Sequence, residues 1–459
     1  MIGYLLFLFA NAMLFVRPAE LFPELEGVQV YLFFMLGAIA FSAEDLMNQL
    51  RWRTLIQQPV NLCILGVTVA IVTSRVFTGN LEGLEHALSG MIKILLYYLL
   101  LVTVINTPER MRTFLMSTAI CATIMIAYSI QDYHEFVAEM TGRPDMAQII
   151  YEQNKLPPDQ RSLLRHIPDR DGEDIYGNEI WFFRLCGLGI FHDPNDVSLL
   201  IVTILIISCY FLTDRELGPL RALWVVPMIV AAVAQYYTFS RGGLLALGAA
   251  ICVWLSTKYG PKVAMAIGAL GVLAAPVALG RAANMDISSG TGQQRIQLWS
   301  DGLMAIRNSR IFFGIGEGMY HDVAGHVAHN SWVHSFVELG VFGGTLFFGC
   351  FFMPAMTFFL MKWHKFRIDD PELRRMFPYI AAILIDWCVG MCSLSRCYTP
   401  STYMVAGTCA AFVNLVGFYR ARPRPLLILN SRTIQPWLAC SAALLLGAYV
   451  FVRLFARWG

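Results

Sequence analysis

Long runs of apolar residues recur along the whole chain, and their length limits the possible fold more than any other feature. Each run is about 16 to 25 residues, which is the length a helix needs to cross the hydrocarbon core of a bilayer. Hydrophobic residues make up 57% of the 459 residues and charged residues 14%, whereas soluble domains carry about 25% charged residues. The alternation typical of a transmembrane β-barrel is absent. The sequence therefore predicts an all-α, polytopic integral membrane protein.

About thirteen such runs can be placed, with boundaries good to a few residues. The first run is short enough to lie in the membrane interface instead, so we expect about 12–13 transmembrane helices. The candidate spans are Ile2–Val16, Val28–Phe41, Val60–Phe77, Leu88–Ile105, Thr113–Ile130, Val197–Thr213, Ala222–Thr238, Leu244–Thr257, Val263–Gly280, Trp332–Met361, Tyr379–Leu394, Thr402–Tyr419 and Pro436–Val450.

Lys and Arg residues concentrate in one alternating set of short loops, for example Arg51 with Arg53 and Lys258 with Lys262. Such loops face the cytoplasm, so two long loops fall on the outer face of the membrane. The net charge of +2 does not indicate a nucleic-acid partner. The expected parts are N-terminal transmembrane helices at 1–130, a first outer loop at 131–191, transmembrane helices at 192–280 with a short outer turn at 238–243, a second outer loop at 281–330, and C-terminal transmembrane helices at 331–459.

The outer turn Tyr237-Thr-Phe-Ser-Arg-Gly-Gly243 joins two spans. Ser240 or Thr238 can cap the following helix, and the two glycines allow the backbone to approach a ligand closely. Arg241 lies at membrane depth, where ionisable residues are expensive and usually functional. A guanidinium stays charged and binds phosphate oxygens in a bidentate way. We interpret Arg241 as a phosphate ligand, with an interfacial anchor as the alternative.

The second outer loop contains a predicted amphipathic helix. Thr291 and Gln294 fit a capping box, and apolar residues at helical spacing follow, so we expect the helix from Gln293 to about Asn308. Arg295 would lie in its first turn, where backbone N–H groups favour an anion. It is a second candidate phosphate ligand, and the alternative is an arginine that snorkels to the interface.

A third candidate region ends the first outer loop. The sequence Asp193-Pro-Asn195 is a helix-start signal, and this role alone can explain it. Alternatively, Asp193, Asn195 and His192 hold sugar hydroxyls at the same outer surface as Arg241. Arg184, at the start of this segment, is a further candidate phosphate-binding cation.

Four of the nine histidines lie between residues 321 and 334. His329 comes just before an apolar span, and Asn330 or Ser331 can cap that helix. The positive end of the helix dipole and the nearby arginines favour the neutral imidazole, which is the form that a general base requires. We interpret His329 as a catalytic base, with a histidine that merely helps to cap the span as the alternative.

Other residues near His329 are expected to support the site. His334 and Glu338 are four apart on one helix face, which predicts a hydrogen bond between them inside the bundle. His326 and Asn330 are candidates to contact a bound sugar or a second substrate that accepts it, or to support the residues that do. The sequence Gly314-Ile-Gly-Glu-Gly318 lacks the context of a nucleotide-binding loop, so we interpret it as a tight loop that delivers the histidines.

A zinc site is the main alternative for the histidine cluster. However, neither H-x-x-x-H nor H-E-x-x-H is present, and no cysteine lies nearby. The spacing therefore favours a site without a metal.

Taken together, these motifs resemble the O-antigen ligase and O-antigen polymerase superfamily of bacterial membrane glycosyltransferases. The matching blocks, in order, are Thr238–Gly243, Arg295-x-x-x-Trp299, Phe313–Gly316, His329-Asn330 and Glu338–Gly340. Residues 184–195 resemble a further block of this superfamily. The Asp-Pro-Asn sequence within them is most similar to the exosortase-associated O-glycosylation ligases.

The resemblance implies a metal-independent membrane glycosyltransferase of the GT-C type, with no cofactor. It implies a glycan donor on undecaprenyl diphosphate, an acceptor hydroxyl on a glycan, a lipid or a protein, and an active site that faces the periplasm from the bacterial inner membrane. By the same resemblance, His329 is the catalytic base, and Arg241 and Arg295 bind the donor diphosphate.

The expected reaction is one displacement that inverts the anomeric carbon. Arginines stabilise the diphosphate leaving group, and His329 accepts the proton of the acceptor hydroxyl. Two alternatives stay open at this point. One is a polysaccharide polymerase that uses the same residues, and the other is a transporter or flippase for lipid-linked glycans.

Overall fold

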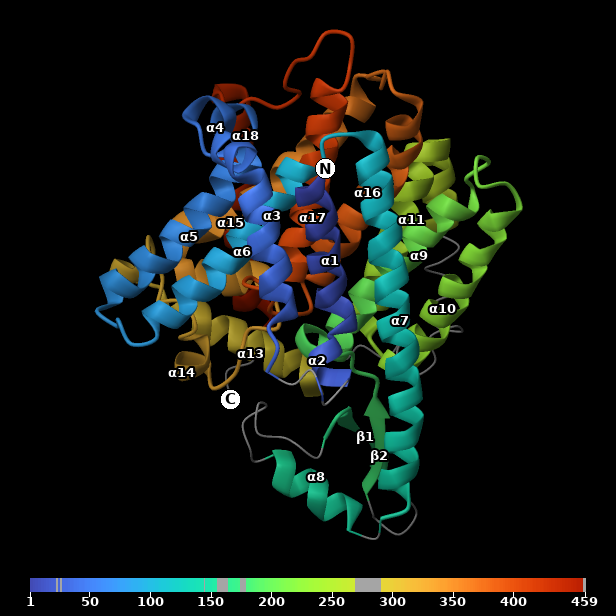
Figure 1. Cartoon of the computed structure of the whole chain (residues 1–459). Helices are drawn as coiled ribbons and strands as arrows, with labels where there is room; N and C mark the ends of the chain where they lie inside the picture. The colour runs from blue at the N-terminus through green and yellow to red at the C-terminus, as the bar shows by residue number, and fades with distance from the viewer. Residues whose placement is uncertain are drawn as a thin grey trace. The chain divides into compact units, whose positions relative to one another are not determined.

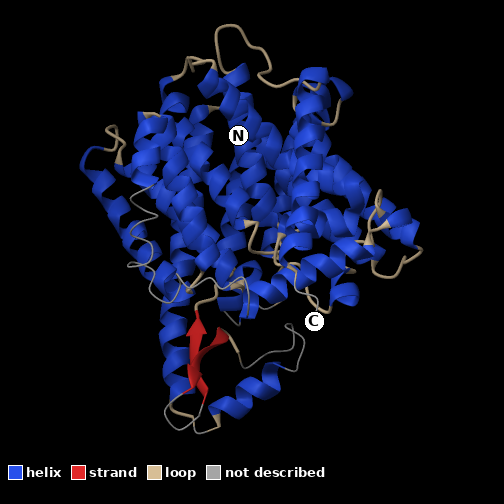
Figure 2. Ribbon diagram, turned by 180° about the vertical axis from the view of Figure 1, so that it is seen from behind, coloured by secondary structure: helices blue, strands red, loops and turns tan. Residues whose placement is uncertain are grey.

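The structure is a computed structural model, and it describes residues 1–21, 24, 27–143, 145–154, 164–173, 179–268 and 290–456. Almost every element in these ranges is a helix, and the one sheet among them is a two-stranded antiparallel hairpin (Figure 2). The prediction of an all-α membrane protein is confirmed.

Ten helices in the described ranges are long and apolar enough to cross a membrane. The first helix, α1, is shorter, as expected, and α16, which covers most of the predicted span Tyr379–Leu394, is not among the ten. Most of the predicted span Val263–Gly280 lies outside the described residues. The elements are α1 (Ile2–Val16), α2 (Pro18–Leu21), α3 (Val30–Gln49), α4 (Trp52–Gln57), α5 (Pro59–Thr78), α6 (Leu84–Val104), α7 (Pro108–Thr141), α8 (Met146–Asn154), β1 (Ile167–Glu173), β2 (Glu179–Arg184), α9 (Pro194–Leu212), α10 (Val225–Thr238), α11 (Arg241–Tyr259), α13 (Gly290–Ala305), α14 (Tyr320–Ala324), α15 (Ser331–Trp363), α16 (Pro371–Gly390), α17 (Pro400–Phe418) and α18 (Ser431–Phe455), with short 3-10 turns at Gly189–Phe191, Gly218–Trp224 and Asn308–Arg310 (Figure 1).

The helices form two compact units. The first unit contains Met1–Phe7, Phe33–Phe114 and Gly248–Gly459, and the second contains Leu8–Leu32 and Leu115–Leu247. Arg295 and His329 therefore belong to the first unit, and Arg241 belongs to the second.

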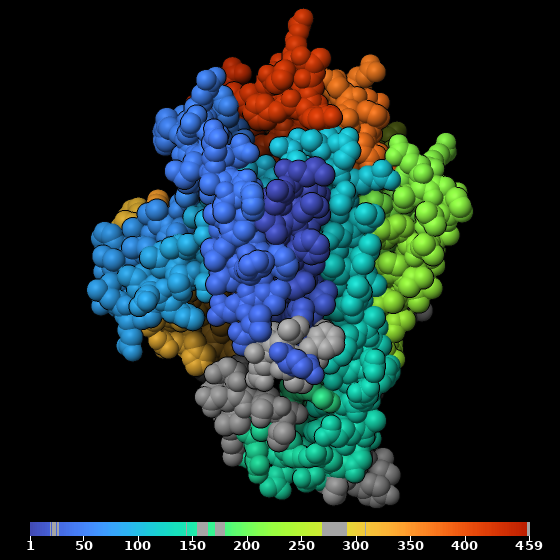
Figure 3. All heavy atoms as spheres, in the orientation of Figure 1, coloured from blue at the N-terminus to red at the C-terminus, as the bar shows by residue number. Residues whose placement is uncertain are grey.

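Many helix faces are apolar and exposed, as lipid contact requires. Helix α3 lies on the surface shown in Figure 3, and its side chains Phe33, Leu36 and Phe41 are all exposed. A soluble protein rarely exposes an apolar surface of this kind. The exposed face of α3 therefore agrees with a position against the bilayer.

The second unit contains the predicted first outer loop, which has more structure than expected. Helix α7 continues to Thr141, α8 follows, and β1 pairs with β2. The end of the hairpin joins the helices, because the Leu185 N–H donates to the Tyr237 carbonyl at the end of α10 (2.9 Å). Helices α9 and α10 pack against each other.

Helix α15 is the centre of the first unit, where it packs against α5, α13, α16, α17 and α18. Its sequence predicts one continuous span, but the backbone breaks at Gly340, where φ is 67° and ψ is −171°. Such an angle interrupts the helical ladder, so two carbonyls before the break and two N–H groups after it need other partners.

The segment before α14 supplies those partners through its own backbone. The Val337 carbonyl accepts from the Ile315 N–H and the Glu338 carbonyl accepts from the Gly316 N–H, both at 3.0 Å. In an unbroken helix, these two oxygens would accept from residues 341 and 342.

The freed N–H groups are also satisfied by this segment. Val341 donates to the Ile311 carbonyl (2.8 Å) and Phe342 donates to the Phe312 carbonyl (3.1 Å). We call residues 311–316 the docked loop. Because it pairs with α15 on both sides of Gly340, the broken helix leaves none of these four backbone groups without a partner.

Two glycines allow the close approach. A Cβ at Gly314 would overlap the Glu338 carbonyl, and a Cβ at Gly340 would overlap the Phe312 carbonyl. Both residues also have positive φ, at 77° and 67°. Steric contact and backbone conformation therefore both require glycine at these positions.

We expect Gly314→Ala and Gly340→Ala to destabilise the protein strongly, because each added methyl group would push the docked loop away from α15. The measurement is the thermal unfolding midpoint of the purified protein in detergent.

Gly325→Ala is the matched control. Gly325 has a similar φ of 74°, but a Cβ there meets no atom within 4 Å, so it costs only the left-handed conformation, about 1–2 kcal/mol. Equal midpoints for all three variants would show that close contact with α15 contributes nothing.

Candidate functional site

His329 immediately precedes the N-terminus of α15, as the sequence predicts. Asn330 is the N-cap residue, and its side-chain oxygen accepts from the N–H groups of Trp332 (3.0 Å) and Val333 (3.2 Å). Asn330 was also a candidate for sugar contact, but its side-chain oxygen is used to cap the helix. His329 itself is half-buried.

The backbone of His329 is in the left-handed region, with φ 49°. A non-glycine residue in this region costs about 1–3 kcal/mol, although histidine adopts it more readily than most residues. The surrounding contacts must therefore hold His329 in this conformation.

Ser331, the first residue of α15, is fixed to the loop between α16 and α17. Its N–H donates to the Met391 carbonyl (2.8 Å), and its hydroxyl donates to the Leu394 carbonyl (2.6 Å). The same hydroxyl accepts from the Arg396 N–H (2.9 Å). These bonds fix the residue that follows the N-cap.

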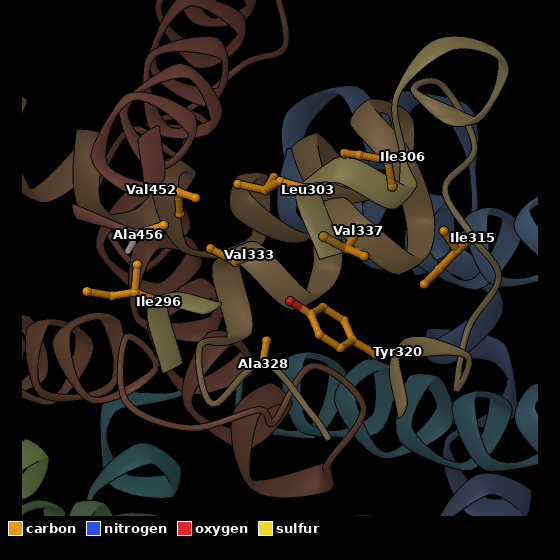
Figure 4. Close-up of a cluster of buried hydrophobic side chains, with 10 residues drawn as sticks. All are labelled: Ile296, Leu303, Ile306, Ile315, Tyr320, Ala328, Val333, Val337, Val452 and Ala456. Carbon is orange, nitrogen blue, oxygen red and sulfur yellow. The ribbon is translucent and has the colours of Figure 1, made fainter. Parts of the chain in front are cut away.

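Helix α13 packs against the start of α15 through a buried apolar cluster (Figure 4). Ile296 and Leu303 come from α13, and Val333 and Val337 come from α15. The remaining members are Ile306, Ile315, Tyr320, Ala328, Val452 and Ala456. The cluster thus joins α13, α14, α15 and α18 into one packed group beside His329.

A hydrogen bond connects α13 directly to the residue before His329. The Trp299 indole N–H donates to the Ala328 carbonyl at 2.6 Å. Arg295 lies four residues before Trp299, on the same helix face and about 6 Å away along the axis. The structure therefore brings the helix of Arg295 and the segment of His329 together.

The predicted capping box on α13 is wrong. The helix begins at Gly290, so Thr291 lies inside it rather than before it, and Arg295 follows the first turn. The helix also ends at Ala305, before the predicted Asn308. Arg295 is half-buried, and its role as a phosphate ligand cannot be derived from helix N-terminal N–H groups.

The other histidines of this loop lie next to His329. The ring centroids of His326 and His329 are 5.6 Å apart, and those of His321 and His326 are 6.3 Å apart. His321 and His326 are exposed. Over the described ranges, no three His, Cys, Asp or Glu side chains are grouped as a metal site requires.

The predicted pair of His334 and Glu338 is present, with 3.0 Å between His334 Nε2 and Glu338 Oε2, and both side chains are buried. The other carboxylate oxygen of Glu338 accepts from the Tyr320 N–H (3.2 Å). The rings of Tyr320 and His334 stack with centroids 5.1 Å apart. Through these contacts with Tyr320, His334 and Glu338 tie α14 to α15.

A largely buried ion pair that the sequence does not predict holds the next part of the loop. Arg75, at the end of α5, lies 3.1 Å from Glu317, and their side chains are 9% and 16% exposed. Burial, with the Glu338 carboxylate nearby, raises the pKa of Glu317, and Arg75 acts in the opposite direction. The two residues are 242 positions apart, so no local pattern relates them. The signal that points to the pair is an arginine in the last turn of an apolar helix.

Arg75 has neighbours that hold the same loop. Phe77, two residues later in α5, stacks on Phe313 with ring centroids 4.0 Å apart. The Asn80 amide donates to the Met319 sulfur (3.2 Å). Arg75 and Phe77 of α5, with Asn80 just after the helix, therefore contact residues 313–319 at three points.

In the second unit, Arg241 is the first residue of α11 and is exposed. Ser240 caps this helix, because its hydroxyl accepts from the Gly243 N–H (3.1 Å). It was one of the two caps that the sequence predicts. Thr238 accepts from the Ser240 N–H (3.3 Å). A Cβ at Gly243 would overlap Ser198 of α9, so this glycine serves helix packing.

The residues predicted to lie near Arg241 do gather at this turn. Arg184 donates from Nε to the Thr238 carbonyl (3.0 Å) and from Nη2 to the Asn195 side-chain oxygen (3.2 Å). The same oxygen of Asn195 accepts from the Ser240 hydroxyl (2.8 Å). These bonds join the end of β2, the start of α9 and the turn before Arg241.

Asp193 has the predicted capping role, because it is the N-cap of α9 and accepts from the Asn195 N–H (2.7 Å). His192, just before it, is exposed. Asn195 thus lies at the Arg241 turn, as expected, and Arg184 bonds to the same turn, while its role as a phosphate ligand stays a prediction. The convergence of Arg241 with Arg295 and His329 stays a prediction.

We expect Arg75→Met to destabilise the protein by about 3–5 kcal/mol, because it leaves the Glu317 carboxylate buried without its cation. The double variant Arg75→Met with Glu317→Gln should recover part of this loss, since neither charge remains. Thermal unfolding of the purified variants measures both effects.

Arg143→Met is the control, because Arg143 pairs with Glu139 where both side chains are exposed, at 42% and 53%. An exposed pair contributes about 1 kcal/mol or less. If the double variant were no more stable than Arg75→Met, the arginine would act through packing and not through charge.

A comparison with known protein families matches this same region of the chain. The O-antigen ligase family model matches residues 226–348, a stretch that contains Arg241, Arg295 and His329. The curated proteins give no match to the chain. The match therefore confirms, over residues 226–348, the O-antigen ligase and polymerase superfamily that the motifs indicate.

Proposed function

We propose that this protein transfers a glycan from undecaprenyl diphosphate to an acceptor hydroxyl at the periplasmic face of the bacterial inner membrane. An O-antigen ligase- or polymerase-type activity in a multi-pass membrane protein follows from the family match and from the ten apolar helices of the described ranges. The donor, the residue roles and the mechanism go beyond this match and are part of the proposal.

The contact between α13 and the segment before α15 carries the proposal. Trp299, one turn after Arg295, bonds to the residue before His329. A permanent cation and a candidate base therefore lie on adjoining segments of the first unit. Transfer from a diphosphate needs this combination, since charge develops on the leaving group while the nucleophile loses a proton.

The leaving group is the polyprenyl diphosphate. As the acceptor oxygen attacks the anomeric carbon, the bond to the diphosphate oxygen breaks and its electron pair stays on the phosphate. In this proposal, Arg241 and Arg295 each bind phosphate oxygens of the donor and stabilise this charge. A diphosphate held in this way leaves without a general acid.

The acceptor proton passes to His329. His329 lies directly before the N-cap of α15, and a base in this role must enter the reaction as the neutral imidazole. General base catalysis of this kind contributes about a hundred- to ten-thousandfold. Because a single displacement takes place, the anomeric configuration is inverted.

The residues around the Arg241 turn have supporting roles in this proposal. Arg184 and Asn195 fix the turn through Thr238 and Ser240, so we assign them to positioning Arg241. The exposed His192 and His326 are left as candidates for contact with sugar hydroxyls. In the first unit, His334 and Glu338 hold α14, and so the loop of the histidines, through Tyr320.

The acceptor class is inferred from one sequence block. In a polymerase the acceptor would be a second lipid-linked glycan, and in a ligase it would be a lipid, another glycan or a protein. The Asp193-Pro-Asn195 sequence favours the exosortase-associated branch, so we propose a protein hydroxyl as the acceptor. No cofactor or metal takes part in the proposed mechanism.

We expect His329→Ala to fold and bind donor but to transfer the glycan about a hundred- to ten-thousandfold more slowly, because the base is lost. The assay uses purified protein in detergent or liposomes, with a polyprenyl diphosphate-linked oligosaccharide and candidate acceptors, and it follows product by gel or mass spectrometry.

His321→Ala is the control within the same loop, since His321 is exposed and has no proposed role. Wild-type turnover by His329→Ala would exclude the base. Loss of wild-type activity in EDTA that zinc or magnesium restores would favour a metal mechanism. If the wild-type protein forms no product but moves lipid-linked glycan across liposomes, it is a flippase.

We expect Arg241→Ala and Arg295→Ala to lower kcat/KM for the donor by about a hundredfold or more, because each removes a preorganised charge from the leaving group. The KM for the acceptor should change little. Lysine at either position should restore only part of the rate, because it lacks the bidentate geometry.

Arg307→Ala is the matched control for Arg295, since Arg307 is exposed just beyond the end of α13. A larger effect on acceptor KM than on donor binding in either alanine variant would assign that arginine to the acceptor.

A further inference from the structure

The hydrogen bond from Trp299 to Ala328 reaches the peptide unit that carries His329. At 2.6 Å it is a short contact, and Ala328 is fully buried. The Ala328 carbonyl and the His329 Cα belong to one rigid peptide plane. Anchoring that oxygen therefore fixes the direction in which the chain enters His329.

The conformation of His329 needs such an anchor. Its φ of 49° is left-handed, whereas Asn330 is extended, with φ −157° and ψ 108°. Asn330 and Ser331 fix the chain on the C-terminal side of His329 through the helix cap and the loop at Met391 and Leu394. Trp299 fixes it on the N-terminal side.

The bond also determines where His329 lies relative to Arg295. Arg295 and Trp299 share one face of α13, and the helix is rigid over a single turn. Reacting groups must be placed to within fractions of an ångström, and a shift of about 1 Å can lower the rate about a hundredfold.

We propose that Trp299 is a positioning residue for the reaction: its indole N–H holds the Ala328–His329 peptide so that the imidazole lies at a set distance from the phosphate-binding Arg295. This inference rests on the proposed function, because it takes His329 as the base. It also gives a physical reason for the four-residue spacing of Arg295 and Trp299.

The packing of α13 does not depend on this bond alone. On the same helix, the Leu298 carbonyl accepts from the Tyr320 hydroxyl (2.9 Å), and Gly302 leaves room for the Tyr320 ring. Ile296 and Leu303 lie in the apolar cluster (Figure 4). Tyr320 therefore ties α13 to α14 at Leu298, the residue next to Trp299.

These two bonds provide a matched pair of single-group deletions. Trp299→Phe keeps an aromatic ring and removes the N–H, while Tyr320→Phe removes only the hydroxyl. We expect Trp299→Phe to lower kcat by about tenfold to a hundredfold and to change the dissociation constant for polyprenyl diphosphate by less than about twofold. Tyr320→Phe should lower the unfolding midpoint comparably and leave kcat close to that of the wild type.

The two substitutions are then combined with His329→Ala. If Trp299 acts by positioning His329, Trp299→Phe has no further effect on kcat once the imidazole is gone, because the two residues act as one unit. An equal loss of rate with and without His329 would overturn the proposal, as would wild-type kcat in Trp299→Phe or an equal loss in Tyr320→Phe.

The failure of the proposed function gives a different result, namely wild-type turnover in His329→Ala alone, and this also removes the basis of the inference. If Trp299→Phe does not yield folded protein, the benzothiophene analogue of tryptophan is incorporated at residue 299. This analogue keeps the shape of the double ring and lacks the N–H, and the same outcomes decide.

Discussion

The exchange of backbone hydrogen bonds between α15 and the docked loop determines the geometry of the first unit. Gly340 opens the helix, and residues 311–316 then satisfy both the carbonyls before the break and the N–H groups after it. This pairing holds Gly314 against Glu338 and so fixes where the chain continues toward the histidines. The buried pair of Arg75 and Glu317 holds the following residues, and the N-cap and Trp299 complete the fixation at His329.

Much of the local structure around the site could be predicted from the sequence. The caps at Ser240 and Asn330 and the pair of His334 and Glu338 involve residues no more than four apart, so helix geometry alone relates them. The capping box at Thr291 shows the limit of this reasoning, because the helix begins before the motif. A capping motif expresses a local preference of about 1 kcal/mol, and packing of the whole helix can override it.

Contacts between distant parts of the chain could not be predicted, because no periodicity records a partner. Arg75 and Glu317 are 242 residues apart, and the bond from Trp299 to Ala328 depends on how α13 lies against α15. The break in α15 was also missed, because a single glycine in an apolar run only weakens a helix. The glycines at Gly314 and Gly340 in the two family blocks are the signal for this contact, since a Cβ at Gly314 would overlap the Glu338 carbonyl and a Cβ at Gly340 would overlap the Phe312 carbonyl.

The docked loop and a continuous α15 compete for the same backbone groups. The N–H groups of residues 341 and 342 can return to the carbonyls of residues 337 and 338 when the loop is absent, so a straight rod satisfies the helix as well as the bent one does. Loss of the loop pairing would favour this straight form, against the bonds that hold Ser331 to Met391 and Leu394, and would therefore strain the chain at His329. The bend thus makes the alignment of His329, the proposed base, conditional on a neighbouring segment of chain that does not contact it through the cap.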